Sequence, residues 1–237
     1  MKDLHTHLCF NIDDGSKSIE ESIFLIKKMS EEGITDIFLT PHYMKDTLYN
    51  ADNRIKRSIY NTLIDKCKEN NIKVNLYLGN EIYIDDDIDR LIRSNKIETL
   101  NNTNYILVEF SLFQYNSNYK LIIHNLLTKG YKVILAHPER YIFIDKKMEL
   151  IEELLEMGVL LQGNYTSLFD KYGSESKKQL IRMLKKRYIT FLGSDIHHDE
   201  KLYLNKLEHK LLRITKDKEY VKDLLYRNVD NLILKNN

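Results

Sequence analysis

The chain begins with Asp3-Leu4-His5-Thr6-His7, a short alternating segment that predicts a β-strand. Because side chains two positions apart on a strand point to the same side, His5 and His7 face one small volume together. Neutral imidazole is the commonest protein ligand for transition metals, so the pair predicts half of a metal site. The spacing alone is weak evidence, and one core histidine beside one exposed histidine would explain it equally well.

The same arrangement, an apolar run that ends in His, Asp or Glu, recurs along the whole chain. Turn residues and the capping-box pair Ser18 and Glu21 follow the first strand and predict a helix that Gly33 ends. Strands are predicted at residues 3–7, 34–39, 74–83, 105–110, 133–136, 159–161 and 189–192. Helices are predicted at residues 18–33, 52–70, 85–93, 118–129, 147–157, 176–186, 201–214 and 218–226, with Ser176 and Gln179 as a second cap.

This alternation gives about seven strand-then-helix units with no linker between them. Such a pattern predicts an α/β fold with a parallel sheet covered by helices, and repeated right-handed crossovers allow the sheet to close into a barrel. The chain has 237 residues, a length typical of one α/β barrel domain, and residues 1–237 are expected to form a single domain of this kind.

The composition excludes several classes of protein. With 36 Lys and Arg against 35 Asp and Glu, the net charge is +1, so no nucleic-acid partner is expected. The apolar runs are all shorter than a membrane span, and the first residues do not resemble a signal segment, so a cytoplasmic protein that is not embedded in a membrane is expected. The two cysteines, Cys9 and Cys67, form no disulfide framework.

In parallel α/β barrels the reactive residues lie at the carboxyl ends of the strands. Eight candidate ligands occur there or just after, and Asp13 and Asp14 lie in the first loop. The eight are His5, His7, His42, Glu81, Glu109, His137, Asp195 and His197. The remaining histidines, His124, His198 and His209, are expected to be ordinary surface or helix residues.

Charge arithmetic predicts what this cluster binds. In one pocket, ionised carboxylates repel one another, as do protonated imidazoles, and burial raises the free energy of each ion. Bound cations would offset both effects. The ligands are too many for one tetrahedral zinc, so two or three ions bridged by a carboxylate are expected. Nitrogen and oxygen ligands without thiolate suit Mn²⁺, Fe²⁺ or Zn²⁺ better than Cu(I) or an iron-sulfur cluster.

The only two prolines, Pro41 and Pro138, each adjoin a candidate ligand. They could hold His42 and His137 at abrupt strand exits, because proline fixes φ and lacks an amide donor. Prolines that simply end strands explain the pattern as well.

Seven motifs in order resemble the PHP-type bacterial protein-tyrosine phosphatases, the CpsB/CapC/YwqE-like enzymes of capsule and exopolysaccharide operons. The resemblance extends from the first residues to about His197. The motifs are Asp3-Leu4-His5-Thr6-His7, Asp13-Asp14-Gly15, Thr40-Pro41-His42, Gly79-Asn80-Glu81-Ile82-Tyr83, Val108-Glu109-Phe110, Ala136-His137-Pro138-Glu139-Arg140 and Gly193-Ser194-Asp195-Ile196-His197.

The resemblance implies a distorted seven-stranded (β/α) barrel of the PHP type with a trinuclear site, usually assigned as Mn²⁺. Three ligand groups are implied: His5, His7, Glu81 and Asp195; Glu81, Glu109 and His137; and Asp14, His42 and His197. Asp13 is barely separable from Asp14. Arg140 is implied to contact the phosphoryl group, and His42 and His197 join it as candidate catalytic residues, since a site histidine could act as general acid.

The implied reaction is hydrolysis of phosphotyrosine in proteins, with the Tyr-rich tail of a bacterial tyrosine kinase that regulates capsule synthesis as partner. The chain departs from the family at one position. Family members commonly carry an Arg-Pro pair after the last histidine, where this chain has Lys201. A lysine supplies positive charge but not the bidentate donors of a guanidinium. Alternatives are a phosphatase for a small phosphoester such as histidinol phosphate, a nuclease-like phosphodiesterase, and a non-catalytic metal-binding regulator.

Overall fold

The computed structural model describes residues 1–144 and 147–235, which form nine strands in two parallel sheets. The sheet orders are β1-β2-β4 and β3-β5-β6-β7-β8-β9. The strands are β1 (Lys2–Thr6), β2 (Asp36–Leu39), β3 (His42–Tyr43), β4 (Asn75–Leu78), β5 (Glu81–Tyr83), β6 (Tyr105–Glu109), β7 (Lys132–Ala136), β8 (Leu160–Asn164) and β9 (Ile189–Gly193). The predicted parallel α/β fold is confirmed, and the seven-stranded barrel stays a prediction.

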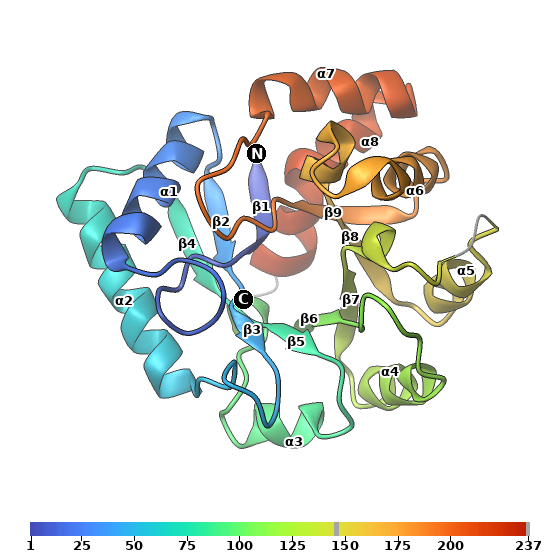
Figure 1. Ribbon diagram of the computed structural model, residues 1–237, viewed down its shortest axis with the longest axis horizontal. Helices are drawn as coiled ribbons and strands as arrows, with labels where there is room; N and C mark the ends of the chain where they lie inside the picture. The colour runs from blue at the N-terminus through green and yellow to red at the C-terminus, as the bar shows by residue number, and fades with distance from the viewer. Residues whose placement is uncertain (145–146, 236–237) are drawn as a thin grey trace.

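Helices surround the strands on the outside (Figure 1). The main ones are α1 (Ile19–Glu31), α2 (Asn53–Glu69), α3 (Ile88–Arg93), α4 (Asn118–Thr128), α5 (Glu149–Glu156), α6 (Gly173–Lys185), α7 (Leu204–Thr215) and α8 (Lys218–Lys222). Three short 3₁₀ turns complete the connections: η1 (Leu100–Asn102) lies between α3 and β6, η2 (Pro138–Arg140) follows β7, and η3 (Tyr165–Phe169) follows β8. Two π-helical segments, η4 (Asp223–Arg227) and η5 (Asp230–Leu234), end the chain.

Local sequence explains some helix ends and not others. As predicted, the Ser18 side chain caps α1 by accepting from the Glu21 amide at 3.2 Å. The predicted cap at Ser176 is wrong, because α6 already begins at Gly173, which adopts φ +85° at the end of a turn. Tyr203, at φ +57°, likewise delays the start of α7 beyond the predicted Lys201.

Two strand regions of the structure are each interrupted for two residues. Thr40 and Pro41 separate β2 from β3, and Gly79 and Asn80 separate β4 from β5. The Asn80 side chain donates to the Pro41 carbonyl at 2.8 Å, which ties the two breaks together. The breaks move the chain from the three-stranded sheet to the six-stranded one just before His42 and Glu81.

The first and last strand regions are joined by backbone contacts. Thr6 and Ile196 form a parallel bridge, and the Asp195 amide donates to the His5 carbonyl at 2.9 Å. A Cβ on Gly193 would lie 2.6 Å from the His5 Cβ, so glycine allows this close approach.

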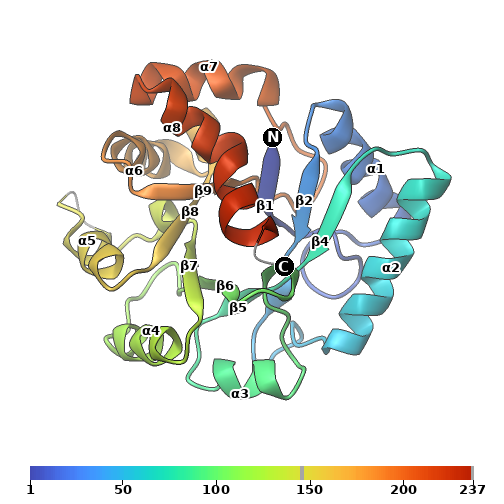
Figure 2. The ribbon, with the colours of Figure 1, turned by 180° about the vertical axis from the view of Figure 1, so that it is seen from behind.

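The interior between the strands is filled from one end by the C-terminus. Val229 and Ile233 are buried in a cluster with Leu4, Phe38 and Leu107. The C-terminal helical segment crosses the strands on the side seen in Figure 2. The opposite ends of the strands, where the polar candidates follow, are left for the site. Among the described residues, no helix is both long and apolar enough to cross a bilayer.

Candidate metal centre

The structure brings all nine predicted ligands to the carboxyl ends of the strands. Each has a nitrogen or oxygen atom within 4 Å of another member of the set. Histidines outside the set lie elsewhere: His124 and His209 are exposed on α4 and α7, and His198 is exposed and pairs with Glu21 at 3.0 Å.

Glu81 lies at the centre of the cluster. Its Oε2 is 3.0 Å from His5 Nε2, 3.2 Å from His7 Nε2 and 3.1 Å from His42 Nδ1. Its Oε1 is 2.7 Å from His137 Nε2. One buried carboxylate therefore faces four imidazoles, the arrangement expected of a bridging ligand.

The remaining carboxylates complete three groups around this centre. Asp195 Oδ1 is 3.3 Å from His7 Nε2, and Glu109 Oε1 is 3.0 Å from His42 Nδ1. Asp14 Oδ1 faces the outer imidazoles of His42 and His197. The groups whose ligand atoms could share an ion are His5, His7, Glu81 and Asp195; His42, Glu81 and Glu109; and His7, Asp14, His42 and His197.

The orphaned atoms of the site fit bound cations. Among the described residues, Glu81 Oε2 and His42 Nδ1 are buried and make no hydrogen bond, although they are only 3.1 Å apart. Buried polar atoms without partners are rare in folded proteins. The two atoms face each other without forming a hydrogen bond. A cation bound between them would accept a lone pair from each.

The electrostatics of the cluster lead to the same conclusion. Burial opposes the charged form of His42, but Glu81 and Glu109 outweigh it and raise its pKa to about 9. Burial also works against ionised Glu81, yet the neighbouring His5 and His42 hold the pKa of that carboxyl well below its usual value. The site therefore keeps Glu81 ionised next to positive charge.

Asp13 and Asp14 have different roles. Asp13 is buried and accepts hydrogen bonds from His7 Nδ1 at 2.8 Å, the Gly15 amide at 2.9 Å and the His42 amide at 3.0 Å. It orients His7 from behind, as carboxylates do for metal-binding histidines. Asp14 is half-exposed and points at His42 and His197, which favours Asp14 over Asp13 as a ligand.

Two of the candidate ligands sit in unusual backbone conformations. His137 has φ +33° immediately before Pro138, and Asp195 has φ +53° after β9. The left-handed region is disfavoured for such residues, most of all before proline. Abrupt exits of this kind, held by the surrounding fold, are typical of functional sites.

Arg140 lies beside the metal ligands. Its NH1 donates to Asp195 Oδ2 at 2.7 Å, and its guanidinium stacks on the Tyr172 ring with the carbon 4.2 Å from the ring centroid. The side chain is 22% exposed, so the guanidinium can be reached from outside. Lys201 is exposed and lies away from the ligands, at a hollow with Lys28 and Glu31 of α1.

Sequence reasoning missed the polar residues of β8. The predicted strand stopped at Leu161, whereas β8 continues to Asn164. Gln162 Oε1 lies 2.9 Å from His5 Nδ1, and Asn164 Nδ2 donates to Asp195 Oδ2 at 2.8 Å. Their position at a strand end was the available signal, whereas nothing in the sequence pointed to Tyr172.

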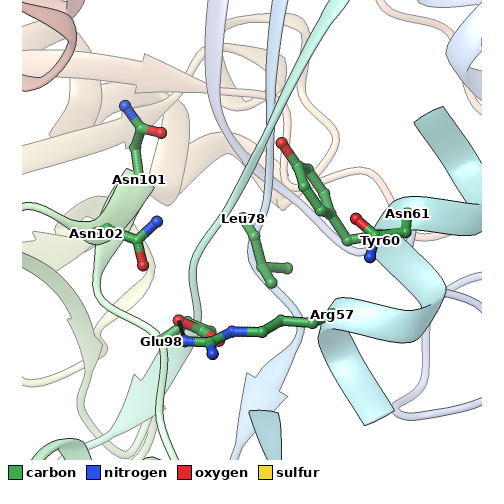
Figure 3. Close-up of a pocket in the computed structure, with 7 residues that line it drawn as sticks. All are labelled: Arg57, Tyr60, Asn61, Leu78, Glu98, Asn101 and Asn102. Carbon is green, nitrogen blue, oxygen red and sulfur yellow. Dashed lines mark hydrogen bonds and ion pairs between the residues drawn. The ribbon is translucent and has the colours of Figure 1, made fainter. Parts of the chain in front are cut away.

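A separate hollow of about 190 Å³ lies between α2 and η1 (Figure 3). Two of its lining residues, Arg57 and Glu98, form a bidentate ion pair in which Arg57 Nε lies 2.5 Å from Glu98 Oε1. The residues that line it include no histidine, so this hollow offers no imidazole ligand for a metal ion.

Comparisons with known proteins agree with this geometry. The family model described as capsular polysaccharide synthesis, CpsB/CapC, matches residues 1–234. CapC of Staphylococcus aureus is 34% identical over 197 residues, which cover 83% of this chain and 77% of that protein.

Solved structures show the same likeness. A chain from the structures of YwqE from Bacillus subtilis and CpsB from Streptococcus pneumoniae, described as metal-dependent tyrosine phosphatases, matches with a TM-score of 0.88 at 26% identity. That match covers 96% of this chain and 95% of the other. Histidinol phosphate phosphatase from Lactococcus lactis has a TM-score of 0.60 at 16% identity over 91% and 93% of the two chains, which shows the fold alone. This chain therefore belongs to the CpsB/CapC family of capsular polysaccharide synthesis.

Proposed function

We propose that this protein is a metal-dependent phosphatase that hydrolyses phosphotyrosine in proteins. The observation that carries the proposal is Glu81, a buried carboxylate whose two oxygens face four imidazoles. Two or three ions would be held by His5, His7, Asp14, His42, Glu81, Glu109, His137, Asp195 and His197. The donors are nitrogen and oxygen atoms without thiolate, which suits Mn²⁺, Fe²⁺ or Zn²⁺. We propose Mn²⁺ because the resemblance to the PHP-type phosphatases implies it, with Fe²⁺ or Zn²⁺ as alternatives.

Bound ions of this kind supply an activated water at neutral pH and offset the charge that develops on the phosphoryl oxygens. Arg140 binds that phosphoryl group through its guanidinium, and Asp195 fixes the orientation of Arg140 through the 2.7 Å bond to NH1. His42 and His197 are 13% and 21% exposed, whereas the other histidines of the set are buried. These two therefore border the side of the site from which the tyrosine phenolate would leave after the phosphoryl group is transferred to water.

The proposed partner is the Tyr-rich tail of a bacterial tyrosine kinase that controls capsular polysaccharide synthesis. Membership of the capsule family supports this partner. A cytoplasmic location would give the enzyme access to such a kinase, and it agrees with free thiols at Cys9 and Cys67.

We also propose that residues 1–237 act as one domain, a distorted barrel of seven strand units. Counting β2 with β3 and β4 with β5 as interrupted strands reduces the nine strands to seven. The bridge between Thr6 and Ile196 supports closure between the first and last units.

The test is metal content together with phosphate release by the purified protein. A phosphotyrosyl peptide and histidinol phosphate are compared under the same metal. We expect at least two bound ions and a higher kcat/KM for the peptide. A preference for histidinol phosphate by about ten-fold, worth about 1.4 kcal/mol of transition-state binding, would overturn the tyrosine-phosphatase assignment.

A further inference from the structure

Two cationic side chains lie against one tyrosine ring next to the metal ligands. The Arg140 guanidinium carbon is 4.2 Å from the centroid of the Tyr172 ring, and the Lys171 ammonium nitrogen is 4.9 Å from it. The Tyr172 hydroxyl donates to Asp195 Oδ2 at 3.0 Å, the same oxygen that Arg140 NH1 contacts. Arg140, Lys171 and Tyr172 therefore form one unit around Asp195.

The Lys171 ammonium is close to the ligands themselves. It donates to the backbone carbonyl of Asp195 at 3.2 Å, and His197 Nδ1 lies 3.1 Å from that same oxygen. The ammonium and the His197 ring are thus within two hydrogen-bond lengths of each other. The Lys171 side chain is 21% exposed, so an anion can reach it from outside.

Lys171 is already paired with a carboxylate from the loop that follows β9. Glu200 Oε2 lies 2.6 Å from Lys171 Nζ, and both side chains are partly exposed. Ion pairs of this kind contribute little stability, so a doubly charged phosphate could displace the carboxylate. The loop itself is anchored separately, because Lys28 donates to the Glu200 carbonyl at 2.7 Å.

We propose that Lys171 is a second phosphoryl-binding cation beside Arg140, and that Glu200 is the counterion that the phosphoryl group displaces. The inference rests on the proposed phosphatase function and names a specificity residue within that site. A lysine supplies a compact charge on a flexible stem, which complements the planar fork of Arg140. Lys171 takes the role for which the sequence had suggested Lys201.

The experiment measures the Ki of inorganic phosphate, with 4-nitrophenyl phosphate as the reporter substrate of the metal-loaded full chain. Lys171→Met should raise both Ki and KM by about ten-fold and change kcat by less than about three-fold, since it removes binding more than chemistry. Lys171→Arg should restore Ki. Glu200→Gln should lower Ki by about three-fold, because the charge that competes with phosphate is gone.

Lys201→Met is the matched control, since it removes the same charge from an exposed site, and it should leave Ki unchanged. The proposal fails if Lys171→Met keeps the wild-type Ki, or if Lys201→Met weakens phosphate equally. It also fails if Glu200→Gln weakens phosphate binding as Lys171→Met does. In that case the Lys171–Glu200 ion pair would stabilise the local structure and would not compete with phosphate. Turnover of a phosphotyrosyl peptide by the wild type is measured separately. The Ki of phosphate can therefore still be interpreted if the protein proves not to prefer that peptide.

Discussion

Single side chains decide the chemistry of this protein, and Glu81 is the clearest case. Its Oε2 lies 3.0–3.2 Å from three imidazole nitrogens, yet it is buried without a hydrogen bond in the described part of the chain. Its place as a candidate ligand was readable from the sequence because the residue follows Gly79-Asn80 near the end of the strand predicted at residues 74–83. The four histidines around Glu81 lie in or directly after three strands, β1, β3 and β7, which are far apart in the chain, so their convergence required the fold.

Glu81→Gln keeps the shape of the side chain and removes the charge that offsets two cations. We expect metal content and kcat to fall together, the rate by about a hundred-fold, since residues of this kind control both metal affinity and activity. Metal analysis and phosphate release measure the two effects. Glu98→Gln is the control, because Glu98 is also buried but pairs with Arg57 outside the site. Full metal content with an unchanged rate would show that Glu81 is only a strand-end residue.

The two cysteines should be dispensable for catalysis. Burial raises the pKa of the Cys9 thiol, and it raises the pKa of Cys67 to about 11, so neither forms a thiolate near neutral pH. A Cys9→Ala and Cys67→Ala double variant should keep most of the activity, whereas chelation should abolish it. Alanine is chosen because both thiols are buried among apolar side chains. Inactivity of the folded, metal-loaded double variant would contradict a metal-only mechanism.

At the scale of elements, strands and helices with local signals were predictable from the sequence. The Ser18 cap and the strand predicted at residues 105–110, observed as β6, are both confirmed. The end of β8 was missed because Gln162 and Asn164 are polar, and only the surrounding site explains why they are buried. The Gly79-Asn80-Glu81 motif was recognised in the sequence, but the lysine behind it was not.

Lys56 of α2 supports both strand breaks from outside the site. Its ammonium donates to Asn80 Oδ1 at 2.6 Å and to the Lys96 carbonyl at 3.0 Å, and Asn80 in turn donates to Pro41. Burial lowers the pKa of Lys56 to about 7, against a partial offset from Glu98. The unfolded chain therefore binds one more proton than the folded chain between about pH 7 and pH 10.5.

Because of this difference, Lys56 adds a term to the free energy of unfolding that increases with pH across that window. Lys56→Met should remove the increase, so the stability of wild type relative to the variant should grow by about 2 kcal/mol between pH 7 and pH 9. Urea denaturation at the two pH values measures it, and comparing the two proteins cancels titration elsewhere, such as that of His42. A wild-type advantage that is constant over this range would show that Lys56 titrates normally.

On the scale of the whole molecule, the two ends of the strands have separate tasks. The candidate metal ligands occupy the carboxyl ends, while Val229 and Ile233 of the C-terminal segment fill the interior beside Leu4 and Phe38. Lys2 on β1 and Asp230 on the C-terminal segment pair at 2.8 Å, which places that segment at the amino end. Stability and chemistry should therefore respond to different substitutions, as is typical of α/β barrels.

Ile233→Ala tests this separation. The side chain is completely buried, so its truncation should lower the free energy of unfolding by about 2–4 kcal/mol. Metal content and kcat per folded molecule should stay at wild-type values, because the cavity opens at the end opposite the ligands. Leu212→Ala, at a side chain 41% exposed on α7, is the matched control and should cost much less stability. If Ile233→Ala instead removed bound metal while the unfolding midpoint stayed fixed, the C-terminal segment would be acting on the site, and the division between the two ends would be wrong.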